Sequence, residues 1–97
     1  MQMDGAAVIR RHIIFSGRVQ GVGFRWRAAG AAEANGCTGW VRNDRTGTVS
    51  MEIQGTERQI GQVISALEKG RFIRIENMTS RPVPVDPEER GFREEWD

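Results

Sequence analysis

The pattern of apolar and polar residues predicts three strands and one helix in the first half of the chain. Residues 8–16 form a short apolar run rich in strand formers, and the run ends at a glycine-rich segment. From residue 24 to residue 35 the apolar side chains recur at helical spacing, and Gly36 is positioned to stop the helix. Residues 37–43 and 48–54 are strand-like runs separated by a short turn. We therefore expect a strand, a helix and an antiparallel hairpin.

The second half of the chain repeats the order of helix and strand. A helix opens after Thr56 and runs to about Lys69, where Gly70 stops it, and its apolar face is formed by Ile60, Val63, Ile64 and Leu67. Residues 72–78 alternate apolar and charged side chains, which predicts a strand with one face in water. Prolines interrupt residues 81–89, so we expect no regular element there.

The end of the chain completes the predicted fold. Phe92 and Trp96 follow the proline-rich segment and are placed to supply a short final edge strand. The order of elements predicts the α+β class, as a ferredoxin-like βαββαβ sandwich in which two helices cover one face of an antiparallel sheet. Such a fold hosts many functions, so the function has to be argued from the sites.

Length and composition narrow the class of protein. The chain has 97 residues, which fits a single domain over residues 1–97 without a separate cofactor domain. Its 14 basic and 13 acidic residues give a net charge of +1, too little to attract nucleic acid or an anionic membrane. Asp4, Arg10 and Arg11 interrupt the apolar N-terminal stretch, so we expect no signal peptide or membrane span and a cytoplasmic location. Cys37 is the only cysteine, which excludes an internal disulfide, and we expect it to be reduced and buried.

The sequence GRVQGVGFR, residues 17–25, joins the first strand to the first helix through three glycines. Glycine permits positive φ and close approach of a ligand, so successive backbone N–H groups can surround one oxyanion. Arg25 falls in the first turn of the helix, where the dipole favours an anion and a guanidinium can bind phosphate by paired hydrogen bonds. The candidate substrate-binding residues are Gly17, Arg18, Val19, Gln20, Gly21, Val22, Gly23 and Phe24.

This glycine-rich loop lacks the features of two nucleotide-binding motifs. No lysine followed by serine or threonine closes it, so it is not a Walker loop. No parallel βαβ unit with a downstream ribose-binding acid follows, so it is not the dinucleotide fingerprint. The sequence therefore indicates that a phosphate group can bind without a nucleotide.

Asn43 is a second polar residue in a suggestive position, at the end of a predicted strand. In an alternating strand it shares a face with Val41, which is also the face of Cys37 and Gly39. Asparagine at a strand end is often only part of a turn, but here it can also meet the start of the first helix and hold a water near an anion bound by Arg25. Asp44 follows directly, and its carboxylate would either repel a bound phosphate or point into solvent.

Two motifs make the chain resemble the acylphosphatase family over roughly residues 8–70. The first family signature is matched by Gly17, Val19, Gln20, Gly21, Val22, Phe24 and Arg25. The second is matched by Gly39, Trp40, Val41, Arg42, Asn43, Gly47 and Val49. The resemblance implies hydrolysis of a carboxyl–phosphate mixed anhydride, with Arg25 and the loop amides binding phosphate and Asn43 orienting the attacking water.

The inventory of reactive side chains suits an activated substrate. A carboxylate leaving group needs little help from a general acid, because its conjugate acid has a pKa of about 4. No Ser-His-Asp set, cysteine–histidine pair or carboxylate cluster can be assembled convincingly, so positioning and charge stabilisation have to suffice. We therefore expect an acylphosphatase that acts as a monomer on a small-molecule acyl phosphate, with no metal, cofactor, nucleic-acid or membrane partner.

Two other classes of function stay open at this point. A non-catalytic phosphate or carbamoyl-phosphate module would resemble the acylphosphatase-like domains of larger maturation enzymes. A single-stranded RNA-binding domain shares the βαββαβ layout, but its aromatic strand motif is missing where Val49, Ser50, Met51 and Glu52 stand.

Overall fold

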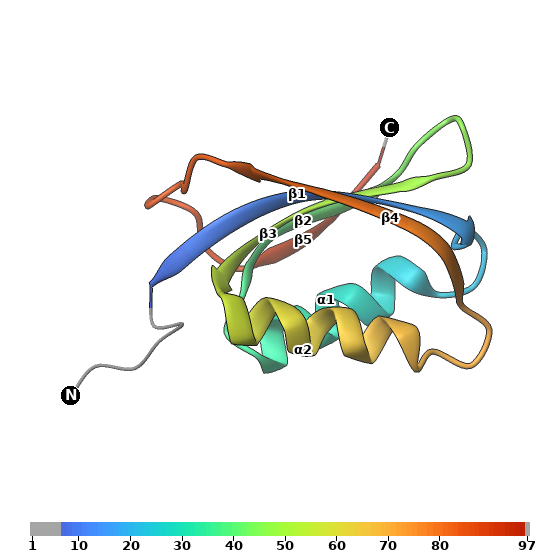
Figure 1. Cartoon of the computed structure of the whole chain (residues 1–97), viewed down its shortest axis with the longest axis horizontal. Helices are drawn as coiled ribbons and strands as arrows, with labels where there is room; N and C mark the ends of the chain where they lie inside the picture. Colours follow the sequence, from blue (N-terminus) through green and yellow to red (C-terminus); the bar gives the residue numbers. More distant parts are fainter. Residues whose placement is uncertain (1–6, 97) are drawn as a thin grey trace.

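The computed structural model describes residues 7–96 and places two helices on one face of a five-stranded sheet (Figure 1). The strands are β1 (Val8–Arg18), β2 (Thr38–Asn43), β3 (Val49–Thr56), β4 (Arg74–Val83) and β5 (Phe92–Glu95). The helices are α1 (Phe24–Ala34) and α2 (Glu57–Glu68). This arrangement confirms the predicted α+β class and the two-layer sandwich. Within residues 7–96, no helix is long and apolar enough to cross a membrane.

The strands follow the order β4-β1-β3-β2-β5, and the last strand differs from the prediction of a wholly antiparallel sheet. The pairs β1 with β3, β1 with β4 and β2 with β3 are antiparallel, whereas β5 pairs with β2 in parallel. Because β4 runs opposite to β2, the last residue of β4 and the first residue of β2 lie at the same end of the sheet. The chain can therefore enter β5 beside the start of β2. In this parallel pair Arg42 lies opposite Glu95, so both strands end at the same place.

The strand predicted over residues 72–78 is wrong at both ends, because β4 covers Arg74–Val83. It therefore includes Pro82, which the sequence placed in an irregular segment. Proline cannot donate a hydrogen bond, but β4 is an edge strand with only β1 as a neighbour, where proline is tolerated. Here Pro82 lies opposite Arg11 of β1.

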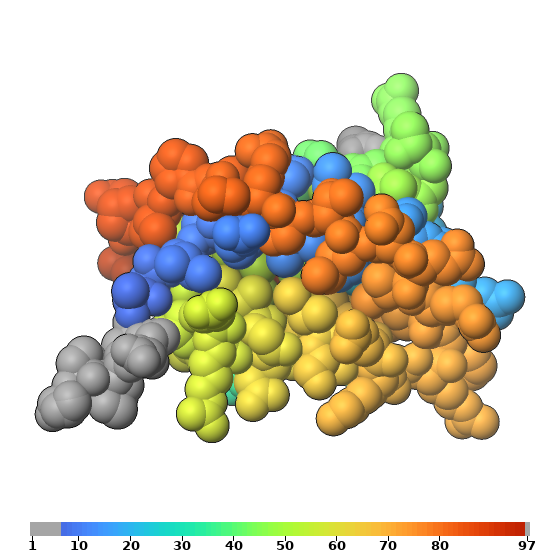
Figure 2. Space-filling model, viewed as in Figure 1, coloured from blue at the N-terminus to red at the C-terminus, as the bar shows by residue number. Residues whose placement is uncertain are grey.

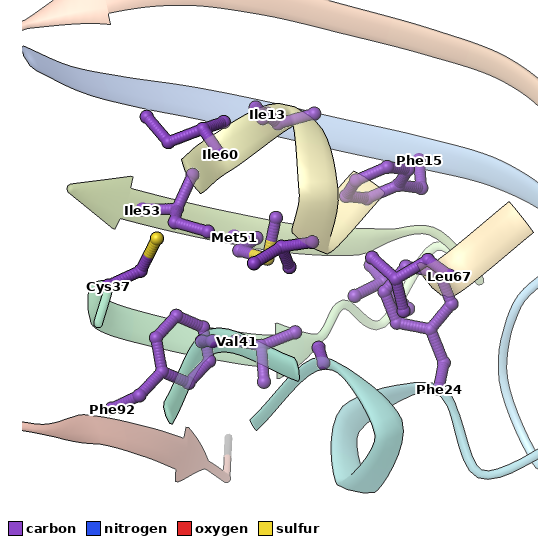
Figure 3. Packing of buried hydrophobic residues seen from close by; sticks show 14 of the residues in the cluster. Ile13, Phe15, Phe24, Cys37, Val41, Met51, Ile53, Ile60, Leu67 and Phe92 are labelled. Atoms are coloured by element: carbon purple, nitrogen blue, oxygen red, sulfur yellow. The ribbon is translucent and has the colours of Figure 1, made fainter. Parts of the chain in front are cut away.

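The core lies between the helices and the sheet and is formed by alternate strand residues and one face of each helix (Figure 3). Phe24 at the start of α1 packs on Phe15 of β1, with ring centroids 4.9 Å apart. The core includes Ile13, Phe15, Phe24, Cys37, Val41, Met51, Ile53, Ile60, Val63 and Leu67. Cys37 is buried as predicted, and burial raises the pKa of its thiol to about 11, so it stays protonated near neutral pH.

A charged network holds the connection between β4 and β5 on the open face of the sheet. Arg10 of β1, only 7% exposed, donates from Nη1 and Nη2 to the two carboxylate oxygens of Glu89 at 2.7 and 3.2 Å, and from Nε to Glu52 at 2.9 Å. Gln54 of β3 forms a reciprocal pair with the backbone of Asp86, at 2.9 and 2.8 Å. Figure 2 shows the connection lying against β1. These contacts fix the position of the connection that leads into β5.

Glu89 links the stability of this network to pH. Burial by itself would raise the pKa of Glu89, but hydrogen bonds from Arg10 and Thr38 and the charges of Arg10 and Arg93 outweigh it. The pKa of Glu89 therefore lies below its ordinary value of 4.5. A carboxyl with a lowered pKa stabilises the fold above its unfolded-state pKa, and this stabilisation is lost as the pH falls through the folded-state pKa.

Replacing Glu89 with glutamine should lower the free energy of unfolding at pH 7 by about 3 kcal/mol, the low end for a broken buried ion pair, since Arg10 keeps Glu52. The difference from the unchanged protein should shrink as the pH falls below 4.5. Urea unfolding at a series of pH values measures both effects. Glu88→Gln, on the exposed surface one residue earlier, is the matched control and should change little. A difference that stays constant down to pH 3 would contradict the linkage.

Candidate active site

The loop between β1 and α1 has the backbone geometry that its glycines predict. Gly21 and Gly23 have φ values of 73° and 78°, in the left-handed region that favours glycine. Gly23 is the N-cap residue of α1 and provides no side-chain cap. The first turn of α1 therefore keeps backbone N–H groups without an acceptor inside the helix, at the positive end of its dipole. Such a helix start is suited to binding an anion.

Gly17 and Arg18 belong to the end of β1 and not to this loop. They pair with Ile75 and Arg74 of β4, after a register shift at Ser16. Gly17 has a φ of 119°, and a Cβ atom there would lie 2.4 Å from the carbonyl oxygen of Arg74. Glycine at this position is therefore explained by the close approach of β4.

Gln20 ties the loop to the hairpin that follows β2. Its Nε2 atom donates to the backbone oxygens of Asp44 and Thr48, at 2.7 and 2.8 Å. Val19 beside it is only 1% exposed and anchors the loop in the core. The side chain of Gln20 thus fixes the distance between the loop and the end of β2, where Asn43 stands.

Arg25 and Asn43 come together at this end of the sheet, although they lie on different elements. Both line a small cavity of about 140 Å³, with Val19, Gly21, Gly23, Phe24, Trp26 and Glu94. Both also line an adjoining cavity of about 350 Å³, with Gln20, Asp44, Glu95 and Trp96. Figure 1 shows the loop, the β2–β3 hairpin and the end of β5 at the same end of the sheet. Arg25 and Asn43 are thus the side chains that the two cavities share.

Of the other candidate residues, five line one of these cavities and three do not. Val19, Gln20, Gly21, Gly23 and Phe24 line one or the other. Val22 lies instead in a surface hollow with Trp26 and Phe72. Gly17 and Arg18 line neither cavity. The structure thus concentrates the candidate site on the loop from Val19 onward.

Arg25 is held by the last residues that the structure describes. Its Nη1 atom donates to the backbone oxygen of Glu95 at 3.3 Å. Its guanidinium lies over the ring of Trp96, with the guanidinium carbon 3.9 Å from the ring centroid. Sequence reasoning did not assign Glu94, Glu95 or Trp96 to the site, because only the parallel pairing of β5 with β2 brings them there.

Asp44 lines the larger cavity, and its carboxylate is hydrogen-bonded within its own hairpin and does not point freely into solvent. Its Oδ2 atom accepts hydrogen bonds from the hydroxyls of Thr48 and Ser50, at 2.8 and 2.7 Å. Its Oδ1 atom accepts one from Nε of Arg42 at 3.4 Å. The carboxylate is thus engaged by its own hairpin, which offsets the repulsion that a phosphate nearby would experience.

The fold and these cavities define a small α+β domain with a site suited to an oxyanion at one end of its sheet. A family profile described as Acylphosphatase matches residues 11–94. The chain is similar to an acylphosphatase of Geobacillus kaustophilus, with 41% identity over 85 residues, 87% of this chain and 90% of that protein. The chain belongs to the acylphosphatase family, as its two motifs predicted.

Solved structures agree with this assignment. An acylphosphatase from Coxiella burnetii has 28% identity and a TM-score of 0.82, over 98% of this chain and all of that one. HypF from T. kodakarensis has 29% identity and a TM-score of 0.77, and the match covers 90% of this chain but 12% of HypF. The same domain therefore also occurs as a small part of a much longer protein.

Proposed function

We propose that this acylphosphatase hydrolyses the carboxyl–phosphate bond of acyl phosphates at the two cavities shared by Arg25 and Asn43. The observation that carries the proposal is that these two side chains, from the start of α1 and the end of β2, line both cavities beside the glycine-rich loop. Arg25 supplies a positive charge, and Asn43 supplies a neutral group that can both donate and accept hydrogen bonds. Together they can hold an anion and a nucleophile.

The phosphate group binds at the smaller cavity. The loop glycines and the uncapped first turn of α1 line this side, and both favour a negative charge. The guanidinium of Arg25 adds paired, charge-assisted hydrogen bonds to two phosphate oxygens. In the transition state of phosphoryl transfer, charge spreads over the equatorial oxygens, and these groups stabilise it without having to move.

Asn43 orients the attacking water. Its carboxamide oxygen accepts a hydrogen bond from the water, while the water's lone pair stays available for attack on phosphorus. A phosphate oxygen takes the proton, and the carboxylate leaves without a general acid because its conjugate acid is already strong. This division of work needs no titratable side chain at the reacting atoms.

The purified protein should hydrolyse benzoyl phosphate in the presence of a chelator at the same rate as without it. The physical reason is that positioning and the charge of Arg25 meet the demands of an activated substrate. Release of inorganic phosphate, followed with and without EDTA, measures this. A phosphate monoester such as p-nitrophenyl phosphate is the control substrate and should turn over far more slowly. Turnover that disappears with EDTA and returns with Mg²⁺ would contradict the proposed mechanism.

A non-catalytic phosphate or carbamoyl-phosphate module is the second candidate. The similarity to a segment that makes up 12% of HypF shows that such a domain also occurs inside a longer protein, where it can serve a larger activity. The two candidates differ in one observable: a binding module protects its ligand, whereas an enzyme consumes it. The benzoyl phosphate assay therefore separates them, and tight phosphate binding without turnover would favour the module.

A further inference from the structure

Trp96 is an exposed tryptophan that the proposed mechanism leaves without a role. The residue is 74% exposed, although burying its ring would be favourable. It stands just beyond β5, whose residue Glu95 lies opposite Arg42 in the parallel pair with β2. The next residues along each strand are Trp96 and Asn43. The topology of the sheet therefore brings Trp96 to the candidate site and to the guanidinium of Arg25.

We infer that Trp96 is a positioning residue that orients the guanidinium of Arg25 for phosphate. The guanidinium carbon of Arg25 lies 3.9 Å from the centroid of the Trp96 ring, close enough for a stacking, cation–π contact. A stacked guanidinium presents its flat face to the ring and keeps its N–H groups, which lie in the plane, for a phosphate. Stacking thus restricts the rotation of Arg25 without consuming the donors that the substrate needs.

A second contact from the same segment completes the restraint. The backbone oxygen of Glu95 accepts a hydrogen bond from Nη1 of Arg25 at 3.3 Å. One edge and one face of the guanidinium are therefore both held by the end of β5. Since β5 pairs with β2, the same strand pair positions Arg25 and Asn43 relative to each other. A long, flexible arginine side chain would otherwise lose more rotamer entropy when substrate binds.

The inference rests on the proposed function, because it gives Arg25 the role of binding phosphate. Trp40 offers a matched comparison within the same chain. It also lies near an arginine, with the guanidinium of Arg42 5.0 Å from its ring centroid, but it lines neither cavity of the site. Any general effect of removing a tryptophan near an arginine should therefore appear in Trp40→Ala as well.

Trp96→Ala should weaken binding of inorganic phosphate about two- to fivefold, as expected for a cation–π contact at an exposed site. In the same variant, KM for benzoyl phosphate should rise and kcat should fall. Trp96→Phe should restore most of the loss because it keeps an aromatic face, and Trp40→Ala should leave phosphate affinity unchanged. Chemical-shift titration with phosphate, steady-state kinetics and thermal melts measure these quantities. Equal losses in Trp96→Ala and Trp40→Ala would overturn the inference.

A double-mutant cycle shows whether Trp96 acts through Arg25. In an Arg25→Gln background, which has no cation to stack, Trp96→Ala should change phosphate affinity less than about twofold. An undiminished loss in that background would mean that Trp96 acts independently, and the inference would be wrong. The two failures are distinguishable: if Arg25→Gln itself binds phosphate as well as the unchanged protein, it is the proposed function that fails.

Fluorescence gives a signature that a merely structural role would not produce. With Trp26→Phe and Trp40→Phe combined, Trp96 is the only remaining tryptophan in the chain. Its emission should change on titration with phosphate, saturating at the same concentration as the chemical-shift titration, because the ligand engages the guanidinium on which the ring stacks. Emission that does not respond to saturating phosphate would count against the stacked arrangement.

Discussion

Replacing Arg25 with alanine should lower kcat/KM for benzoyl phosphate about 10³-fold or more. An arginine that meets the transition-state charge of phosphoryl transfer contributes an effect of about this size. Here Arg25 also lines both cavities of the site, so its loss removes binding and transition-state stabilisation together. Steady-state kinetics over a wide substrate range measure the effect. Retention of more than about a tenth of the activity would show that phosphate binds elsewhere.

The fold should survive this change, which makes the kinetic result interpretable. Within residues 7–96, the side chain of Arg25 donates one hydrogen bond, to the backbone of Glu95, and it takes no part in the core. Arg27 is the matched control, two residues on in the same helix. Its Nε donates to the backbone oxygen of Ala66 at 2.6 Å and ties α1 to the end of α2. Arg27→Ala should therefore lower the melting temperature while kcat/KM stays close to normal, the reverse of Arg25→Ala.

The parts of the site that are local in the chain were predictable from the sequence. The loop and Arg25 lie within nine consecutive residues, and the glycines at 21 and 23 adopt the positive φ that their presence implies. Asn43 was placed on the face of Val41 by strand alternation, and that face is the one that packs on the helices. Periodicity suffices in these cases because burial of one face dictates the conformation.

The contribution of β5 was not predictable in the same way. A strand of four residues carries too little pattern to define its direction or its partner. Its position depends instead on contacts far apart in the sequence, such as Arg10 with Glu89 and Gln54 with Asp86. The sequence therefore left Glu94 and Trp96 outside the site, although both line its cavities.

Gln20 shows a different limit of sequence reasoning. Its position in the loop predicts substrate binding, and it lines the larger cavity, while its amide donates to two backbone oxygens of the hairpin. A polar side chain in a loop can serve either the ligand or the loop's own geometry, and composition does not distinguish the two.

Asn43→Ala should lower kcat about 10²-fold while the affinity for inorganic phosphate changes less than about twofold. An oriented hydrogen-bonding side chain at the reacting atoms contributes about this much to the chemical step. Its effect should fall on kcat because Asn43 holds the water, whereas the loop and Arg25 hold the anion. This split between the two residues is the most direct test of the division of work in the site. Inhibition by phosphate measures the affinity for the anion, and single-turnover rates measure the chemical step.

Asn35→Ala is the matched control for the asparagine. Asn35 caps the opposite end of α1, where its Nδ2 donates to the backbone oxygen of Ala31 at 2.9 Å, so this variant should lose stability and keep its kcat. Asn43→Asp sharpens the test, because aspartate keeps the shape but brings a negative charge beside the phosphate and should be at least as inactive as alanine. If Asn43→Ala instead weakened phosphate binding as strongly as Arg25→Ala and left the single-turnover rate at saturation intact, Asn43 would be a ligand for the anion, and the water would need another partner.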